Sequence, residues 1–265
     1  MLMTFLTLFA IVLYLVATGL LARPLLGRGE AASRLAMAAA SLAVIAHASV
    51  VFGMHRGALD LHFYAALSLT ACVVAALTVV VNLNRPVAAL GVIVFPLAAL
   101  LLAVDVFLAP PTLPRPMDWQ IKLHVSIALI AYGLLSLGAI VALLLAFQEG
   151  ALRKRRLGTW LRALPPLTLT EALLFRLIGA GFLGLTLTLL SGSLFVENIR
   201  DQHLAHTIVL SVIAWIIFAA LLWGRWRHGW RGRRAVNLTL AGMAMLALAF
   251  FGSKFVLEVL LQRVS

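Results

Sequence analysis

Eight long apolar stretches alternate with short polar segments along the chain. They are Met3–Ala22, Arg34–Phe52, Phe63–Leu83, Ala88–Ala109, Lys122–Phe147, Glu171–Val196, His206–Trp223 and Leu238–Leu260. A helix needs about 20 predominantly apolar residues to cross the hydrocarbon of a bilayer, and each stretch is roughly that long. The stretches are apolar all round, whereas a surface helix of a soluble protein keeps one polar face. The pattern therefore predicts an all-α integral membrane protein, a bundle of eight transmembrane helices.

Composition supports this interpretation. Hydrophobic residues make up 63% of the 265 residues and charged residues only 11%, whereas soluble domains carry about 25% charged residues. The connections between the stretches are too short to hold a further folded unit. We therefore expect a single transmembrane domain over residues 1–265.

The distribution of charge predicts how the chain is oriented in the membrane. Arginines and lysines gather in the first, third, fifth and seventh connections, most densely at Arg153–Arg156 and from Arg225 to Arg234. Cytoplasmic loops of membrane proteins carry an excess of these residues. We expect the odd-numbered connections in the cytoplasm, both termini outside, and a multi-pass protein of the bacterial inner membrane.

The net charge of +12 does not indicate a nucleic-acid-binding protein. Trp226 and Trp230 alternate with the arginines, which is typical of anchoring at an anionic lipid surface. Cys72 is the only cysteine, which excludes a disulfide within the chain and a cluster of thiolate ligands. The sequence contains no recognisable nucleophile–base pair, metal-binding box or phosphate loop, so we do not expect an enzyme.

Six of the seven histidines fall on the predicted outer side or in the outer half of a helix. His55, His62 and His203 lie in connections, where histidine is unremarkable. His47 lies within the second stretch, and an ionisable group inside a span is a functional candidate because burying it in hydrocarbon costs a few kcal/mol or more. The alternative for His47 is a histidine that is hydrogen-bonded inside the bundle.

His124 and His206 begin the fifth and seventh stretches at the predicted outer interface. After His124 the next turns place Ala128, Tyr132 and Ser136 on one slowly drifting helix face. A neutral imidazole there has two nitrogens, of which one can donate its N–H to the bundle while the other binds a metal or a haem iron. The alternative is a polar residue that caps the helix at the interface.

The segment "LHVSIALIAYGLLSLGAIVALLLAF", which contains His124, resembles the ligand-bearing helix of the membrane cytochrome c assembly superfamily of CcsA, CcmC and CcmF types. The later segments "LPPLTLTEALLFRLIGAGFLGLTLTLLSGSLF", "HTIVLSVIAW", "GWRGRRAVNLTLAG" and "FFGSKFVLE" resemble its YpjD-like branch. The resemblance is strongest over residues 122–260, and over the first half it rests mainly on the number of helices. It implies haem as the cofactor, held at the outer face by an axial histidine that corresponds to His124.

The chain also departs from the family pattern. The family places a tryptophan-rich segment between two ligand histidines, and the corresponding stretch Ser191–Trp215 lacks the run of tryptophans. Lys254 stands where the second outer histidine is expected. A haem held by His124 alone would be five-coordinate. A second axial ligand would come from His206 or His47, or alternatively from His203 or Lys254.

Two functional hypotheses follow. The first is a haem-handling or cytochrome c maturation accessory protein of the inner membrane, with haem and cytochrome-maturation proteins as partners. The alternative is a non-haem accessory or stability subunit of another membrane complex, such as a transporter, built on a reduced haem-handling scaffold. Small residues at Gly181, Gly184, Thr188 and Gly192 predict close helix packing within the bundle or in a dimer.

Overall fold

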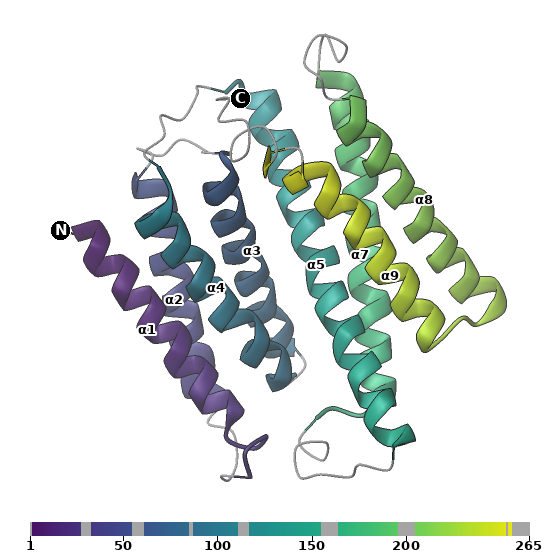
Figure 1. The fold of residues 1–265 in the computed structure, drawn as a ribbon, viewed down its shortest axis with the longest axis horizontal. Helices are drawn as coiled ribbons and strands as arrows, with labels where there is room; N and C mark the ends of the chain where they lie inside the picture. The colour runs from purple at the N-terminus through teal and green to yellow at the C-terminus, as the bar shows by residue number, and fades with distance from the viewer. Residues whose placement is uncertain are drawn as a thin grey trace. The chain divides into compact units, whose positions relative to one another are not determined.

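The computed structural model describes residues 2–27, 33–54, 61–84, 87–110, 117–154, 164–195, 205–252 and 254–255. In these ranges the chain forms helices and no strand (Figure 1). They are α1 (Leu2–Ala22), α2 (Ser33–Met54), α3 (Phe63–Asn84), α4 (Ala88–Leu108), α5 (Trp119–Arg153), α7 (Leu167–Phe195), α8 (Ala205–His228) and α9 (Arg233–Ala247), followed by a short π-helix, η1 (Leu248–Gly252).

Eight of the described helices are long and apolar enough to cross a membrane, α9 and η1 together forming the last of them. The prediction of an all-α membrane protein with eight spans is therefore confirmed. The location of both termini outside the cell stays a prediction.

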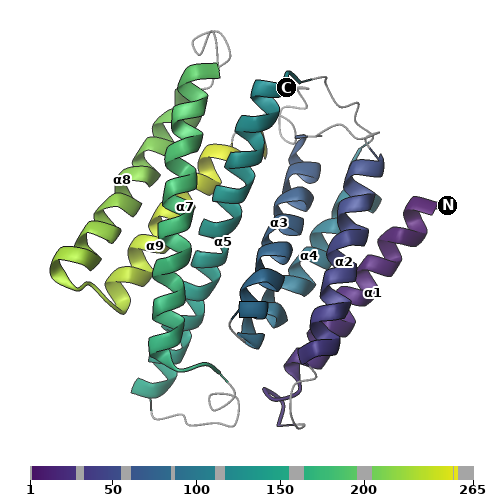
Figure 2. The same ribbon diagram turned by 180° about the vertical axis from the view of Figure 1, so that it is seen from behind.

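The helices group into two compact units. The first contains α1 to α4, and the second contains α5, α7, α8, α9 and η1 (Figures 1 and 2). The expectation of one transmembrane domain stays a prediction.

The first unit has a buried centre that contains both polar and aromatic side chains. Its four helices each contribute one side chain: Tyr14 from α1, His47 from α2, Ser68 from α3 and Phe95 from α4. All four are fully buried. The Tyr14 and Phe95 rings stack with 5.9 Å between centroids, and His47 packs edge-on against Tyr14 at the same separation. A buried polar group is costly without a partner, so the hydrogen bonds of His47 described below let this centre form.

The second unit is organised by an antiparallel pair, α5 and α7, which lie side by side along their length (Figure 2). The small-residue stripe of α7 faces α5. A methyl group at Gly181 would lie 2.7 Å from Leu135, one at Gly184 would lie 2.8 Å from the Ala131 side chain, and one at Gly192 would lie 3.2 Å from His124. Because there is no space for larger side chains there, the stripe is used for packing within the bundle.

The α5 helix is much longer than its apolar stretch. It contains 35 residues, which is about 52 Å at 1.5 Å per residue, whereas the hydrocarbon core is about 30 Å thick. The apolar pattern ends at Phe147, but the helix continues to Arg153 because five of the next six residues, all except Gly150, are good helix formers. As a result, α5 and α7 extend past the turn that joins α8 to α9 (Figure 1).

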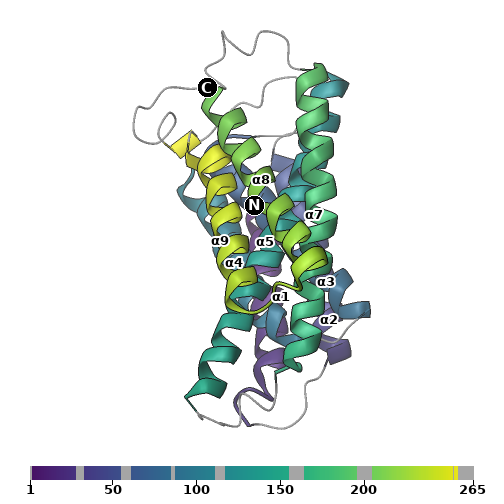
Figure 3. The ribbon, with the colours of Figure 1, turned by 90° about the vertical axis from the view of Figure 1, so that its right-hand side faces the viewer.

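The α8 and α9 helices form an antiparallel hairpin that completes the second unit (Figure 3). Their turn includes Gly229 and Gly232, both with positive φ, at +64° and +55°. At the other end of α9 the helix widens into η1, although the sequence predicts an uninterrupted span to Leu260. The Thr207 hydroxyl of α8 donates to the Ala249 carbonyl of η1 over 3.1 Å. Single π-turns occur often at functional sites.

Candidate functional site

His124 lies in the second turn of α5 and points to α7. Its Nδ1 is 2.8 Å from the Ser191 hydroxyl. The Ser191 hydroxyl also donates to the Thr188 carbonyl over 3.1 Å. The imidazole is partly buried, and Ser191 is 8% exposed. A side chain from another helix therefore fixes the orientation of the ring.

This pair of hydrogen bonds assigns the tautomer of His124. A serine hydroxyl has one hydrogen, and Ser191 donates it to the Thr188 carbonyl. With that hydrogen donated to Thr188, the Nδ1 of His124 is the donor to Ser191, and this arrangement favours the tautomer in which Nε2 carries a lone pair. Nε2 has no hydrogen-bond partner in the part of the chain that the structure describes. An imidazole with one N–H tied to the protein and one free lone pair is the usual form of a metal-bound histidine.

Gly192, the residue after Ser191, is in contact with the His124 ring. A methyl group there would be 3.2 Å from Cε1 of the imidazole. About one turn from this contact, at the first residue of α5 and the last residue of α7, Trp119 and Phe195 pack with 6.3 Å between ring centroids. Trp119 is 67% exposed. The ligand candidate therefore stands on a tight α5–α7 contact, next to an aromatic pair at the helix ends.

The helix face that follows His124 turns away from α7. Tyr132 packs against Phe251 of η1 with 5.5 Å between centroids, and the Ser136 hydroxyl is 3.9 Å from the Met243 sulfur of α9. Each four-residue step rotates the direction by about 40°, so Tyr132 and Ser136 are turned by about 80° and 120° from His124. This drift is large enough to move the face from α7 to α9.

His206 lies exposed in the first turn of α8, in the same unit as His124. No hydrogen bond or ring contact among the described residues joins the two histidines. His206 is thus accessible to a bound group, while its role as the second axial ligand beside His124 stays a prediction.

His47 belongs to the first unit and has a different environment. Its Nδ1 is hydrogen-bonded to the Tyr14 hydroxyl at 3.3 Å, and its Nε2 to the Ser68 hydroxyl at 3.1 Å. Both ring nitrogens are therefore engaged. This geometry matches the alternative of a hydrogen-bonded bundle histidine, and iron ligation by His47 stays a prediction.

Trp215 is the tryptophan retained at the end of the Ser191–Trp215 stretch, and its contacts are with α7. Its indole N–H donates to the Thr186 hydroxyl over 2.9 Å, and its ring stacks on Phe182 with 5.4 Å between centroids. Trp215 therefore packs α8 against α7. Lys254 lies with its ammonium 5.7 Å from the Phe250 ring centroid. His55 and His203 fall outside the described residues.

The described residues around His124 offer a single oriented imidazole as a metal ligand. No group of three or more His, Cys, Asp or Glu side chains comes together within the described ranges. A porphyrin supplies the equatorial ligands itself, so a single oriented imidazole provides an axial position. The free Nε2 of His124 meets that requirement.

Sequence reasoning did not identify Ser191 as the partner of His124. The two residues are 67 positions apart. The available signal was the Ser191-Gly192 dipeptide at the end of the small-residue stripe, in which one residue makes space for the ring and the other bonds to it.

Comparison with known proteins gives consistent matches. The model of the cytochrome c assembly protein family matches residues 60–261. The inner membrane protein YpjD of Escherichia coli (strain K12) is 30% identical over 263 residues, which cover 96% of this chain and 98% of that protein. The cytochrome c biogenesis protein CcsA of Prochlorococcus marinus (strain MIT 9303) is 26% identical over 217 residues, covering 69% of this chain and 67% of that protein. No solved structure matches the chain significantly.

Proposed function

The chain belongs to the cytochrome c assembly protein family, and from this premise we propose that it is a haem-handling accessory protein of cytochrome c maturation. The proposed site is near the outer face of the bacterial inner membrane, with His124 as an axial ligand of the haem iron. The membrane location is supported by the eight spans and by the YpjD relative, which is named an inner membrane protein. The outer position of His124 rests on the distribution of arginines.

One observation carries the proposal: the hydrogen bonds from His124 through Ser191 to the Thr188 carbonyl. They hold the imidazole with the Nε2 lone pair free. Such outer partners raise the basicity of a ligating histidine and fix its angle. Haem, when bound, would supply an iron with open axial positions, and the chain's contribution is to hold and orient one nitrogen against it.

His206 is the preferred candidate for the second axial ligand. It shares a unit with His124, begins α8 and is exposed. His47 would have to give up a hydrogen bond to Tyr14 or Ser68 before it presents a lone pair, which carries the cost of an unsatisfied buried group. Of the two candidates, His47 is the one that would have to break a hydrogen bond of the described structure.

Substitution of Ser191 by alanine tests the proposal. We expect Ser191→Ala to weaken haem binding by about tenfold or more, the usual effect of losing a partner that orients a ligand. Ser193→Ala is the matched control, because Ser193 is exposed on the same helix and donates only to the Leu190 carbonyl. Haem titration of the two purified variants, followed by absorbance, is the measurement. Equal affinities for both variants would contradict the proposed role of the hydrogen bonds.

The alternative, a non-haem accessory subunit of another membrane complex, is favoured by one observation. Trp215 is the only tryptophan of the Ser191–Trp215 stretch, and it is engaged in packing against Phe182 and Thr186. A dedicated partner would co-purify with the protein from cells in which haem synthesis is blocked. A maturation accessory would lose that association together with haem.

A further inference from the structure

A pocket of about 500 Å³ lies at the end of the second unit opposite to His124. The last turns of α5, the first turn of α7 and the start of α9 line it. Its polar lining is Glu149, Arg153, Thr168, Glu171, Arg231 and Arg233, and its apolar lining includes Leu145, Leu152 and Leu167. Beside the residues that line it, α5 and α7 extend past the α8–α9 turn (Figure 1).

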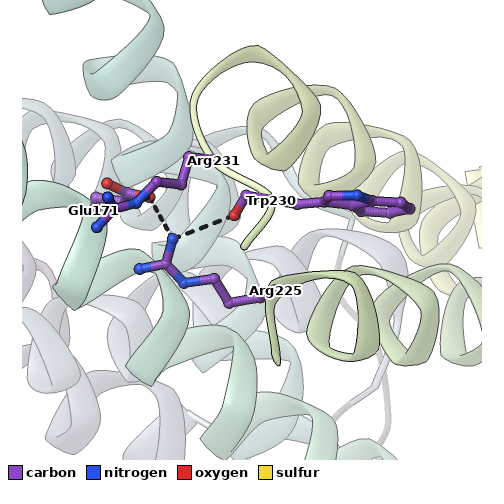
Figure 4. Close-up of polar contacts among 4 residues, drawn as sticks. All are labelled: Glu171, Arg225, Trp230 and Arg231. Carbon is purple, nitrogen blue, oxygen red and sulfur yellow. Dashed lines mark hydrogen bonds and ion pairs between the residues drawn. The ribbon is translucent and has the colours of Figure 1, made fainter. Parts of the chain in front are cut away.

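One wall of the pocket is a fixed ion-pair group with one carboxylate and two guanidinium groups. Glu171 accepts from Arg225 over 2.9 Å and from Arg231 over 3.1 Å (Figure 4). Arg225 also donates to the Trp230 carbonyl over 3.3 Å and lies 4.5 Å from the centroid of the Phe175 ring. These contacts join α7, α8 and the α8–α9 turn. The charge of Glu171 is therefore already balanced by protein groups.

The remaining charged groups of the pocket have both signs and no ion pair within the described residues. They are the carboxylate of Glu149 and the guanidinium groups of Arg153 and Arg233. The Glu149 carboxylate lies against Gly232, because a methyl group there would be 2.9 Å from Oε1. Gly232 is the N-cap of α9, so the Glu149 carboxylate lies at the N-terminal end of that helix.

The pocket has the features of a lipid headgroup site. It is built from the ends of three membrane-spanning helices, which places it at the level of an interface. Charged groups and leucines share its lining, as an amphipathic ligand requires. Arginine pockets between transmembrane helices bind the phosphates of lipids. An unpaired carboxylate beside the arginines suits a ligand that also carries a positive charge.

We propose that this pocket binds the headgroup of phosphatidylethanolamine, with the phosphate held by Arg153 and Arg233 and the ammonium by Glu149. Phosphatidylglycerol offers the phosphate but no cation for Glu149. Phosphatidylcholine offers a cation without N–H donors, so it forms no hydrogen bond to the carboxylate. The pocket therefore distinguishes the three lipids by their headgroups.

Native mass spectrometry of the purified full-length protein tests the proposal. The protein is mixed in detergent with equal amounts of the three lipids, matched in acyl chains. We expect phosphatidylethanolamine to be retained about fivefold to tenfold over each of the others, the effect of about one hydrogen bond. In Glu149→Gln, phosphatidylethanolamine should lose its advantage over phosphatidylcholine. In Arg233→Gln, the retention of both phosphatidylethanolamine and phosphatidylcholine should fall.

Arg227→Gln is the control, because Arg227 is exposed on α8 and does not line the pocket. Its lipid retention should equal that of the unaltered protein, and thermal unfolding of each variant shows that the fold is kept. Arg153→Gln is the second variant should Arg233→Gln fail to fold. An unchanged lipid preference in Glu149→Gln, or preferential retention of phosphatidylglycerol, would overturn the proposal. Soluble phosphoethanolamine that displaces the lipid at equal concentration would show a soluble ligand instead.

Discussion

The His124→Ala variant is expected to lose haem binding almost completely. The substitution removes the proposed ligand nitrogen itself, so the loss should exceed the roughly 10- to 100-fold effect of removing an orienting partner. The fold should be unchanged, because Ser191 keeps its hydrogen bond to the Thr188 carbonyl. The measurement is haem content and the Soret absorbance of the purified variant after exposure to haem.

Three comparisons separate ligation from a general disturbance. Imidazole added to His124→Ala should restore the band, because it fills the space left next to Gly192 and supplies the missing nitrogen. His228→Ala, at the far end of α8, should bind haem like the unaltered protein. His206→Ala should retain haem but change the spectrum from six-coordinate to five-coordinate. A full Soret band in His124→Ala without imidazole would refute the assignment of the ligand.

The Gly184→Leu variant is expected to destabilise the second unit severely. The Cβ of any side chain at Gly184 would lie 2.8 Å from the Ala131 Cβ and 3.2 Å from its Cα. A leucine therefore pushes against the α5 backbone, which cannot rotate away, and overpacking costs about 1–3 kcal/mol or more. We expect a clear fall in the midpoint of thermal unfolding in detergent.

The α7 helix offers a matched control for this prediction. Gly179 is five positions earlier, and a methyl group added there meets nothing within 4 Å. The same change, Gly179→Leu, should leave the midpoint unchanged or raise it slightly, because leucine is a better helix former than glycine by up to about 1 kcal/mol. Equal destabilisation by both substitutions would mean that helix propensity, and not the α5–α7 contact, explains the effect.

The sequence alone predicted the membrane spans because each is apolar on all sides. It also predicted the packing use of Gly181 and Gly184, since small residues three or four positions apart form a continuous groove on one helix face. The family match over residues 60–261 confirms the resemblance that the motifs from residue 122 onward indicated. These features are local in the sequence, so one segment at a time is sufficient to recognise them.

The features that complete the candidate site depend on contacts between distant segments. Nothing in the neighbourhood of His124 identifies Ser191 as its partner, because the pairing is set by the register of α5 against α7. The partners of His47 come from two other helices, α1 and α3, and could not be predicted from the sequence around His47 either. The pocket at the end of the second unit opposite to His124 depends on where the α8–α9 turn meets α5, which charge patterning does not encode.

The visible absorption spectrum of the full-length protein, purified in detergent from cells supplied with haem, tests the central claim most directly. A protein that ligates haem through His124 should show a Soret band distinct from that of free haem in the same detergent, and the band should remain after gel filtration. A spectrum without that band, from protein whose helices are intact by circular dichroism, would contradict haem binding by this chain.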